Sequence, residues 1–205
     1  MRVAVVGGTG DFGLALAQRL VEAGEDVVVG SRDPQRAADK AAEIGASGAA
    51  NEDAVRGADF VVLAVKAEAA LATAAGLRAA IGTTPVLSVA SELRFTKGGV
   101  LPTEDPRSIA ERTQEELAAP VCAGLHSLAA ASLAHGRADG DALVCGDDAT
   151  AKERALELAA KVVTGRSLDA GPLASARALE GLTAVIVNLN KRYKGHAGIE
   201  ITGLP

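Results

Sequence analysis

Three glycines near the start of the chain have the spacing of a turn that binds a pyrophosphate. The pattern Gly8-x-Gly10-x-x-Gly13 follows an apolar run at residues 3–6 and precedes a segment whose apolar side chains recur at helical intervals. Glycines at such positions permit a tight turn, a close approach of the backbone to phosphate, and close packing of helix on strand. Because the first N–H groups of the helix would face the anion, the spacing predicts a dinucleotide-binding strand, turn and helix.

The end of the next apolar run, residues 27–29, indicates which dinucleotide is bound. An NAD site places Asp or Glu there to hold the ribose 2′-hydroxyl, whereas this chain has Ser31, Arg32 and, one helical turn on, Arg36. Arginine offers bidentate, charge-assisted hydrogen bonds to phosphate, so these residues favour the 2′-phosphate of NADP. Nearby Asp33 suits the first turn of a helix. The alternative is that both arginines are solvated residues at a helix start.

The composition of the whole chain excludes several function classes. The chain has 205 residues and a net charge of −5 from 21 basic and 26 acidic residues, so it lacks the basic character of nucleic-acid-binding proteins. Its few aromatic residues offer no base-stacking platform. It shows neither a signal peptide nor an apolar run long enough to span a bilayer, so we expect no membrane partner and a cytoplasmic location.

Alternating β and α patterns predict an α/β fold, a Rossmann-type doubly wound parallel sheet with right-handed crossovers and a small C-terminal helical portion. The length suggests a dinucleotide domain over residues 1–170 and a C-terminal portion over 171–205, which is too small to fold alone. After the second strand we expect strands at 60–65, 85–89, 120–125, 142–145 and 167–170, helices at 37–44, 51–55, 66–81, 107–117, 149–163 and 173–190, and a long loop at 91–106.

Ligands of such sheets bind beyond the carboxyl ends of the strands, which nominates Lys66, Ala90-Ser91-Glu92 and His126-Ser127. For His126 two interpretations stay open, a hydrogen-bonded residue that shapes its strand end or a contact to a bound ring. Lys66 either approaches the phosphates or extends to water. His135 and His196 lie in polar surroundings, and we expect them to be solvated.

Two further groups of residues have simpler explanations than a metal or a nucleophile. Asp147 and Asp148 could form a metal-binding carboxylate pair. However, they directly precede a helix, and the helix dipole stabilises Asp at a helix N-terminus. Cys122 and Cys145 lie in apolar, strand-like segments that suit a small buried residue. We therefore expect no metal site and no disulfide or catalytic role for either cysteine.

Several stretches together resemble the F420-dependent NADP reductase family. The resemblance covers nearly the whole chain and is most particular at Cys145-Gly146-Asp147-Asp148 and Leu168-Asp169-Ala170-Gly171-Pro172-Leu173. It also includes the opening Met1 to Gly13, the segment Gly30-Ser31-Arg32 with Arg36, Asn51-Glu52-Asp53-Ala54, Leu125-His126, Arg177 and Glu180-x-Leu182-Thr183.

The resemblance implies hydride exchange between NADP and the 5-deazaflavin coenzyme F420, with the two rings face to face in a cleft closed by the C-terminal portion. Such transfer depends on positioning and on a dry cleft, so no catalytic acid or base is assigned, with His126 kept as a possible contributor. The cofactor-binding residues are expected to be Gly8, Thr9, Gly10, Asp11, Phe12, Gly13, Ser31, Arg32, Arg36, Val65, Lys66, Ala90, His126 and Ala130.

Two other functions remain as alternatives. Lys66 and His126 could donate a proton in an NADP-dependent reductase of a small carbonyl or imine. A non-catalytic NADP-binding sensor would need no acid–base group at all. The last predicted helix is apolar on more than one side, with Leu179, Val185 and Leu189 on it, so we expect a homodimer through this region.

Overall fold

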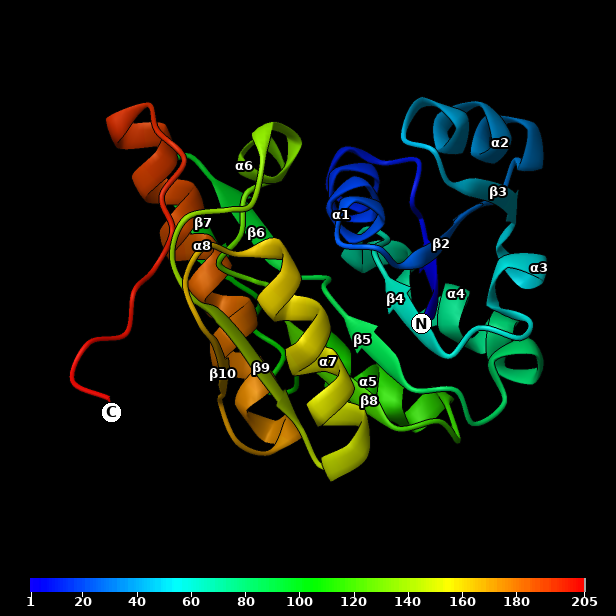
Figure 1. Ribbon diagram of the computed structural model, residues 1–205. Coiled ribbons are helices and arrows are strands. Elements are labelled where there is room, and N and C mark those ends of the chain that lie inside the picture. Colours follow the sequence, from blue (N-terminus) through cyan, green and yellow to red (C-terminus); the bar gives the residue numbers. More distant parts are fainter. Residues whose placement is uncertain (205) are drawn as a thin grey trace.

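The structure is a computed structural model that describes residues 1–204, so the final residue of the predicted C-terminal portion, Pro205, lies outside the described residues. Strands and helices alternate along most of the chain (Figure 1). The elements are β1 Arg2–Val6, α1 Asp11–Glu22, β2 Asp26–Ser31, α2 Pro34–Glu43, β3 Ser47–Ala50, α3 Asn51–Val55, β4 Phe60–Leu63, α4 Ala67–Ile81, β5 Val86–Ser88, β6 Leu93–Thr96, β7 Gly99–Pro102, α5 Ile109–Glu116, β8 Val121–Gly124, α6 Ala130–His135, β9 Ala142–Gly146, α7 Ala149–Val162, β10 Ser167–Asp169, a 3₁₀ turn Leu173–Ser175 and α8 Ala176–Tyr193.

Residues 1–204 build one eight-stranded sheet in the order β10-β9-β8-β5-β4-β1-β2-β3 and a separate hairpin of β6 and β7. The strands from β3 to β8 in this order are parallel, which confirms the doubly wound α/β architecture. The chain order reverses beside β1, where β4 and β2 flank it. This switch point is the place where such sheets bind ligands.

The expectation of an entirely parallel sheet is wrong at one junction. Strands β8 and β9 pair antiparallel, with Cys122 opposite Gly146 and Gly124 opposite Val144, while β10 runs parallel to β9. The segment between them contains the six-residue α6 and no long crossover helix of the kind that usually joins parallel strands. Strands β9 and β10 therefore end at the edge opposite the carboxyl ends of β1, β4, β5 and β8.

Helices cover both faces of the sheet, because alternate strand residues point to opposite sides. On one face Val3, Val5 and Val62 pack with the buried sides of α1 and α7. On the other, Ala4 and Val61 pack with α3, α4, α5 and the start of α8. Figure 1 shows α7 and α8 on the two sides of strands β9 and β10. The buried strands are apolar on both faces, as expected for a covered parallel sheet.

Four short elements were not predicted from the sequence: β3, the two strands of the β6–β7 hairpin, and α6. Strand β3 consists of small residues, and Gly48 lets it pack on α2, since a Cβ there would lie 2.3 Å from the backbone of Ala37. The segment expected to be a loop at 91–106 contains the β6–β7 hairpin, and α6 lies between β8 and β9. These elements lack the length or the periodicity on which sequence prediction depends.

Polar contacts along one side attach helix α8 to α5 and to the segment that precedes α5. The buried Glu180 carboxylate accepts hydrogen bonds from the N–H groups of Ile109 and Ala110 at the start of α5, each 3.1 Å long. Burial raises the pKa of Glu180 to about 7. One turn earlier, Arg177 donates to the carbonyl oxygens of Thr103 and Asp105, at 2.6 and 2.9 Å.

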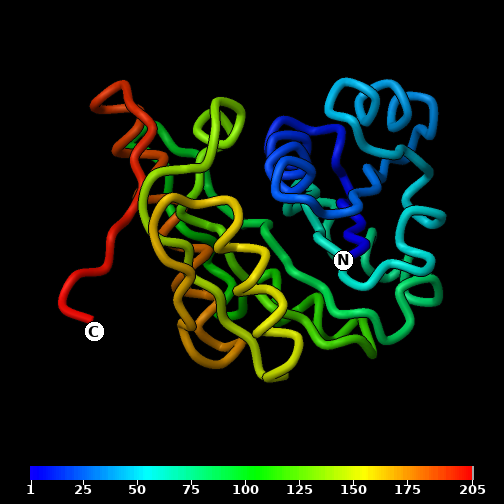
Figure 2. Tube along the Cα trace, viewed as in Figure 1, coloured from blue at the N-terminus to red at the C-terminus, as the bar shows by residue number. Residues whose placement is uncertain are grey.

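After α8 the chain runs back along the molecule in an extended tail (Figure 2). The N–H of Ile201 donates to the Asp141 carboxylate at 2.8 Å, and the N–H of Asp141 donates to the carbonyl of Ile199 at 2.7 Å. These bonds attach the tail to the segment that precedes β9. Within residues 1–204 we find no helix that combines the length and the apolarity needed to cross a membrane.

Replacing Gly13 by Ala should destabilise the fold, although Ala favours a helix interior. A Cβ at Gly13 would lie 2.6 Å from the carbonyl oxygen of Gly7, so the turn or the helix must shift. We expect the free energy of unfolding in urea to fall by about 1–3 kcal/mol. As a control, Gly76→Ala in α4, where no atom lies within 4 Å of the new methyl group, should raise it by about 0.5–1 kcal/mol. An unchanged midpoint for Gly13→Ala would contradict this account.

Candidate functional site

The turn between β1 and α1 brings backbone N–H groups to the carboxyl edge of the sheet. Gly7 adopts a φ of +79°, and a Cβ there would lie 2.7 Å from the carbonyl oxygen of Ala64, so the turn touches the end of β4. Helix α1 begins after Gly10 without a side-chain cap. Its first N–H groups are therefore available to an anion, which the helix dipole also favours.

The end of β2 presents arginines next to this turn. Exposed Arg36 extends toward it, with one guanidinium nitrogen 3.5 Å from the carbonyl oxygen of Thr9. Asp33 caps α2 instead of facing a ligand, because its carboxylate accepts the N–H groups of Gln35 and Arg36 at 3.0 and 3.2 Å. Arg32 is exposed beside it. The carboxylate that could have indicated NAD is thus committed to the helix.

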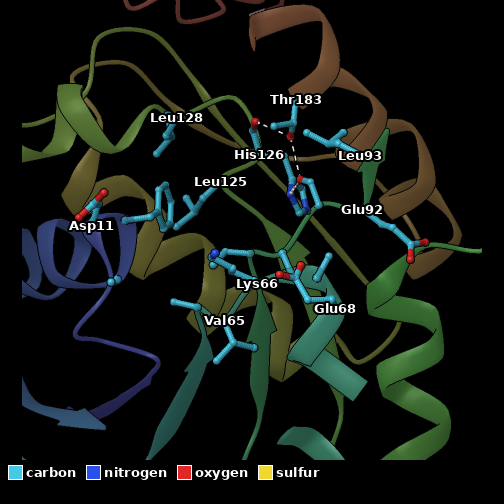
Figure 3. Close-up of a pocket in the computed structure, with 18 of the residues that line it drawn as sticks. Asp11, Val65, Lys66, Glu68, Glu92, Leu93, Leu125, His126, Leu128 and Thr183 are labelled. Carbon is cyan, nitrogen blue, oxygen red and sulfur yellow. Dashed lines mark hydrogen bonds between the residues drawn. The ribbon is translucent and has the colours of Figure 1, made fainter. Parts of the chain in front are cut away.

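A cavity of about 760 Å³ opens at the same edge of the sheet. It lies between the start of α1, the segments that follow β4, β5 and β8, and the middle of α8 (Figure 3). Its size falls within the range of small-molecule and cofactor sites. The lining residues are Gly10, Asp11, Phe12, Gly13, Ala64, Val65, Lys66, Ala67, Glu68, Val89, Ala90, Ser91, Glu92, Leu93, Phe95, Leu125, His126, Leu128 and Thr183.

A cluster of three polar side chains lies in the wall of this cavity. The Ser91 hydroxyl is 3.1 Å from Nδ1 of His126 and 2.8 Å from the hydroxyl of Thr183, which itself donates to the carbonyl oxygen of His126 at 2.9 Å. His126 is only 6% exposed, and burial lowers its pKa to about 4. The imidazole is therefore neutral near pH 7 and cannot act there as a proton donor in the imidazolium form.

Comparison with known proteins gives the family of this chain. Residues 2–92 match the family described as NADP oxidoreductase, coenzyme F420-dependent. The F420-dependent NADP reductase of Methanothermobacter thermautotrophicus is 35% identical over 100% of this chain and 96% of its own length. The chain belongs to the F420-dependent NADP reductase family. The Methanocaldococcus jannaschii enzyme of the same name is 33% identical over 100% of this chain and 99% of its own.

A solved structure has the same overall fold. The crystal structure assigned to an F420-dependent NADP reductase from Arthrobacter sp. FB24 superposes with a TM-score of 0.84 at 28% identity, covering 99% of this chain and 100% of that chain. Family membership therefore extends beyond the glycine turn to the C-terminal helix that completes the cavity.

The cavity brings together eight of the residues expected to bind cofactors, namely Gly10, Asp11, Phe12, Gly13, Val65, Lys66, Ala90 and His126. The other six lie outside its lining. Gly8 is buried in the turn, where its N–H donates to the carbonyl of Gly30 at 3.0 Å. Thr9, Ser31, Arg32 and Arg36 lie along the turn and the end of β2, and Ala130 begins α6, which packs against α1.

Several lining residues were not among the expected site residues. Thr183 comes from α8, more than fifty residues beyond His126, and Phe95 comes from the hairpin that was expected to be loop. The stretch Glu180-x-Leu182-Thr183 contributed to the family resemblance, but nothing in its spacing placed it beside His126. A packing contact between distant segments supplies this part of the site.

The other candidate groups have structural roles. Asp148 caps α7 by accepting the N–H of Ala151 at 2.8 Å, which confirms the capping interpretation, and Asp147 accepts the N–H of Leu173 at 2.9 Å. Cys122 and Cys145 are buried and unpaired, and burial raises the pKa of each thiol to about 12. Across residues 1–204 no three metal-ligating side chains gather at one place. His135 and His196 are exposed, as expected.

We predict that His126 keeps its neutral form down to about pH 4, because burial removes the charged ring from water. An unfolded chain takes up the proton near the ordinary value of 6.5, so stability is lost as the pH falls from about 6.5 to 4. The loss is on the order of 3 kcal/mol. Ring chemical shifts in an NMR titration measure the pKa, and urea unfolding of His126→Asn, which lacks this slope, is the control. A ring that titrates near pH 6.5 would contradict the prediction.

Proposed function

We propose that this protein is an oxidoreductase that transfers a hydride between NADP(H) and coenzyme F420. The observation that carries the proposal is full-length membership of the family together with one cavity that joins the start of α1 to α8. When bound, the reduced nicotinamide supplies a hydride and the deazaflavin accepts it, or the reverse. The protein has to hold both rings in register and exclude water.

The residues at the turn and at β2 fit the NADP half of the reaction. The uncapped start of α1 suits the pyrophosphate, and Gly8 and Gly13 permit the tight turn before it, because a Cβ at either position would collide with backbone. Arg32 and Arg36 would hold the 2′-phosphate by charge-assisted hydrogen bonds. The Asp33 carboxylate caps α2, so it is not free to accept a hydrogen bond from a ribose 2′-hydroxyl as the acidic residue of an NAD site does.

The cavity is poorly suited to chemistry that needs a protonated histidine. Reduction of a carbonyl or imine, the alternative function, requires a proton donor beside the substrate. His126 is neutral near pH 7, and its Nδ1 is engaged with Ser91. Hydride exchange between two cofactor rings needs no protonated histidine, whereas the alternative reductase would depend on Lys66, which also lines the cavity, as its proton donor.

Division of the chain at about residue 170 and homodimerisation are further parts of the proposal. Helix α8 closes the cavity with Thr183 yet leaves Val185, Leu189 and Tyr193 on one side 52%, 39% and 72% exposed. Such a patch is typical of an interface, and a second copy would cover it.

We also propose that the protein works in the cytoplasm. The two thiols, Cys122 and Cys145, are buried and unpaired. Free buried thiols are the usual state of cysteine in reducing compartments. This supports the location expected from the sequence.

Purified protein mixed with NADPH and oxidised F420 should exchange a hydride. We expect the absorbance of reduced nicotinamide and of oxidised deazaflavin to fall together in equal molar amounts. No exchange in either direction would reject the proposal. Turnover of small carbonyls or imines from a panel would support the alternative reductase. Tight NADPH binding without any turnover would instead support a non-catalytic NADP-binding sensor.

Replacing Arg32 by Ala should weaken NADPH binding about 10- to 100-fold and leave NADH binding unchanged. The reason is that only NADPH carries the 2′-phosphate, and a hydrogen bond to a charged group contributes about 1.5–3 kcal/mol. Fluorescence titration measures both dissociation constants. Arg154→Ala, an exposed arginine on α7, serves as the control with wild-type values. Equal losses for the two nucleotides would refute the role of Arg32.

Replacing Leu189 by Lys should convert a dimer to a monomer at micromolar concentration, because the charge would be buried in the proposed interface. Sedimentation velocity measures the mass of both proteins. The control is Arg154→Ala, an exposed residue of α7, which should leave the mass unchanged. A wild-type protein that sediments as a monomer would contradict the proposed dimer.

A further inference from the structure

One end of the cavity lies where the β6–β7 hairpin meets the second half of α8 (Figure 1). Leu93 and Phe95 of β6 line the cavity, and Phe95 is 72% exposed, so this strand forms part of the cavity mouth. Figure 3 shows Leu93 and Thr183 on the side of the cavity away from Asp11 and the start of α1. The mouth is therefore separate from the turn that suits the pyrophosphate.

Asn188 of α8 attaches the hairpin to the helix. Its side-chain oxygen accepts the N–H of Val100 at 2.8 Å, and its amide nitrogen donates to the carbonyl oxygen of Val100 at 2.7 Å. Gly99 permits this approach, since a Cβ there would lie 2.8 Å from the Asn188 oxygen. Val100 is the partner of Phe95 in the hairpin. The two bonds therefore fix the position of Phe95 relative to α8.

Lys191 lies on the side of α8 that carries Thr183. It follows Thr183 by eight residues, which places it about 12 Å further along the same side of the helix. Its ammonium group lies over the Phe95 ring, 5.4 Å from the ring centre. This distance allows a cation–π attraction. The contact holds a positive charge at the cavity mouth.

Two more lysines lie near this position. Lys97 is in the turn of the hairpin, two residues after Phe95, and Lys194 directly follows α8. All three lysines are exposed, and no ion pair within residues 1–204 involves any of them. By contrast, Arg94 of the same hairpin pairs with Glu104 at 2.8 Å. In a chain of net charge −5, three unpaired ammonium groups in one region favour an anion there.

The helix dipole explains only part of this arrangement. A cation in the last turn of a helix is stabilised by the dipole, and this accounts for Arg192 as well as for Lys191. The dipole does not account for Lys97, which belongs to the hairpin, or for the contact between Lys191 and Phe95. The shared feature of these groups is their place at the cavity mouth.

The acidic residues that line the cavity leave this mouth positive. Asp11 and Glu68 lie in the first turns of α1 and α4, and Glu92 is paired with Arg112 at 3.0 Å. Neither the hairpin, residues 93–102, nor the second half of α8, residues 181–193, contains an Asp or a Glu. An anion beside Lys191 would therefore meet no unpaired carboxylate from either element.

We propose that Lys191, together with Lys97 and Lys194, forms a subsite for a phosphate or carboxylate group on a side chain of the ring substrate that extends out of the cavity. This inference rests on the proposed function, because coenzyme F420 carries phosphate and carboxylate groups on the side chain of its deazaflavin ring. The subsite increases the affinity for such substrates and takes no part in hydride transfer. The phosphates of NADP are expected at the start of α1 and the end of β2 instead.

The deazaflavin riboside, which has the ring of F420 without the phosphate and carboxylates, separates the ring from its side chain. Lys191→Glu should raise KM for F420 about tenfold, because the variant repels the anion, and should leave kcat near the wild-type value. KM for the riboside and the dissociation constant of NADPH should stay within about twofold. Lys191→Arg keeps the charge and should stay within about threefold of wild type for F420.

Arg154→Glu is the matched control, since it makes the same change in net charge on exposed α7 and does not line the cavity. It should leave both KM values unchanged. An equal rise of KM for F420 and the riboside in Lys191→Glu, or no rise for either, would overturn the subsite. Weaker NADPH binding with unchanged KM for F420 would assign the lysines to NADP and would also overturn it.

Salt provides a test that needs no variant. Raising the ionic strength from about 50 to 300 mM screens exposed charges, so KM of wild-type protein for F420 should rise while KM for the riboside stays constant. The same salt dependence for both substrates would contradict the subsite.

Failure of the proposed function can be told apart from failure of the subsite. If wild-type protein exchanges no hydride with F420 or with the riboside, the proposed function fails, and fluorescence titration of both compounds decides the subsite. Tighter binding of F420 than of the riboside, lost in Lys191→Glu, would support it. Equal binding of the two compounds, or no binding of either, would overturn it.

Discussion

The site depends on the close approach of two backbone segments in the first turn. The start of α1 can face the sheet edge only because Gly13 lies against the carbonyl of Gly7, with no room for a Cβ between them. Gly7 in turn contacts the end of β4 through Ala64. One set of contacts therefore sets the position of the helix N-terminus relative to the strand ends that carry the rest of the cavity.

The second constraint is the attachment of α8. Glu180 gives up hydration to bond two N–H groups of α5, and the same helix presents Thr183 to Ser91 and His126. A buried carboxylate needs such partners, so α8 has a defined depth and rotation rather than a sliding apolar contact. Hydrophobic packing alone tolerates small shifts, whereas a hydrogen-bond chain through three residues does not.

Local patterns were sufficient for the parts of the fold that depend on local chemistry. The glycine spacing, the apolar strand of Phe60 and its neighbours, and the Asp148 cap could be predicted because each acts within a few residues. The reversed direction of β9 and the β6–β7 hairpin could not be predicted. Each depends on contacts between segments far apart in the chain, namely β8 with β9 and α8 with β7. For the same reason the strand-end rule nominated Ser91 and His126, while Thr183, which joins them, emerged only from tertiary packing.

The reversed direction of β9 places two of the stretches that resemble the family away from the cavity. The stretches most particular to the family, Cys145 to Asp148 and Leu168 to Leu173, lie at the edge opposite the cavity, where the Asp147 carboxylate ties the start of the last helical segment to the sheet. They hold the start of α8 in a fixed position relative to the sheet, and α8 then extends to the cavity. A change at this edge would therefore move Thr183 at the cavity, although no residue of these two stretches lines it.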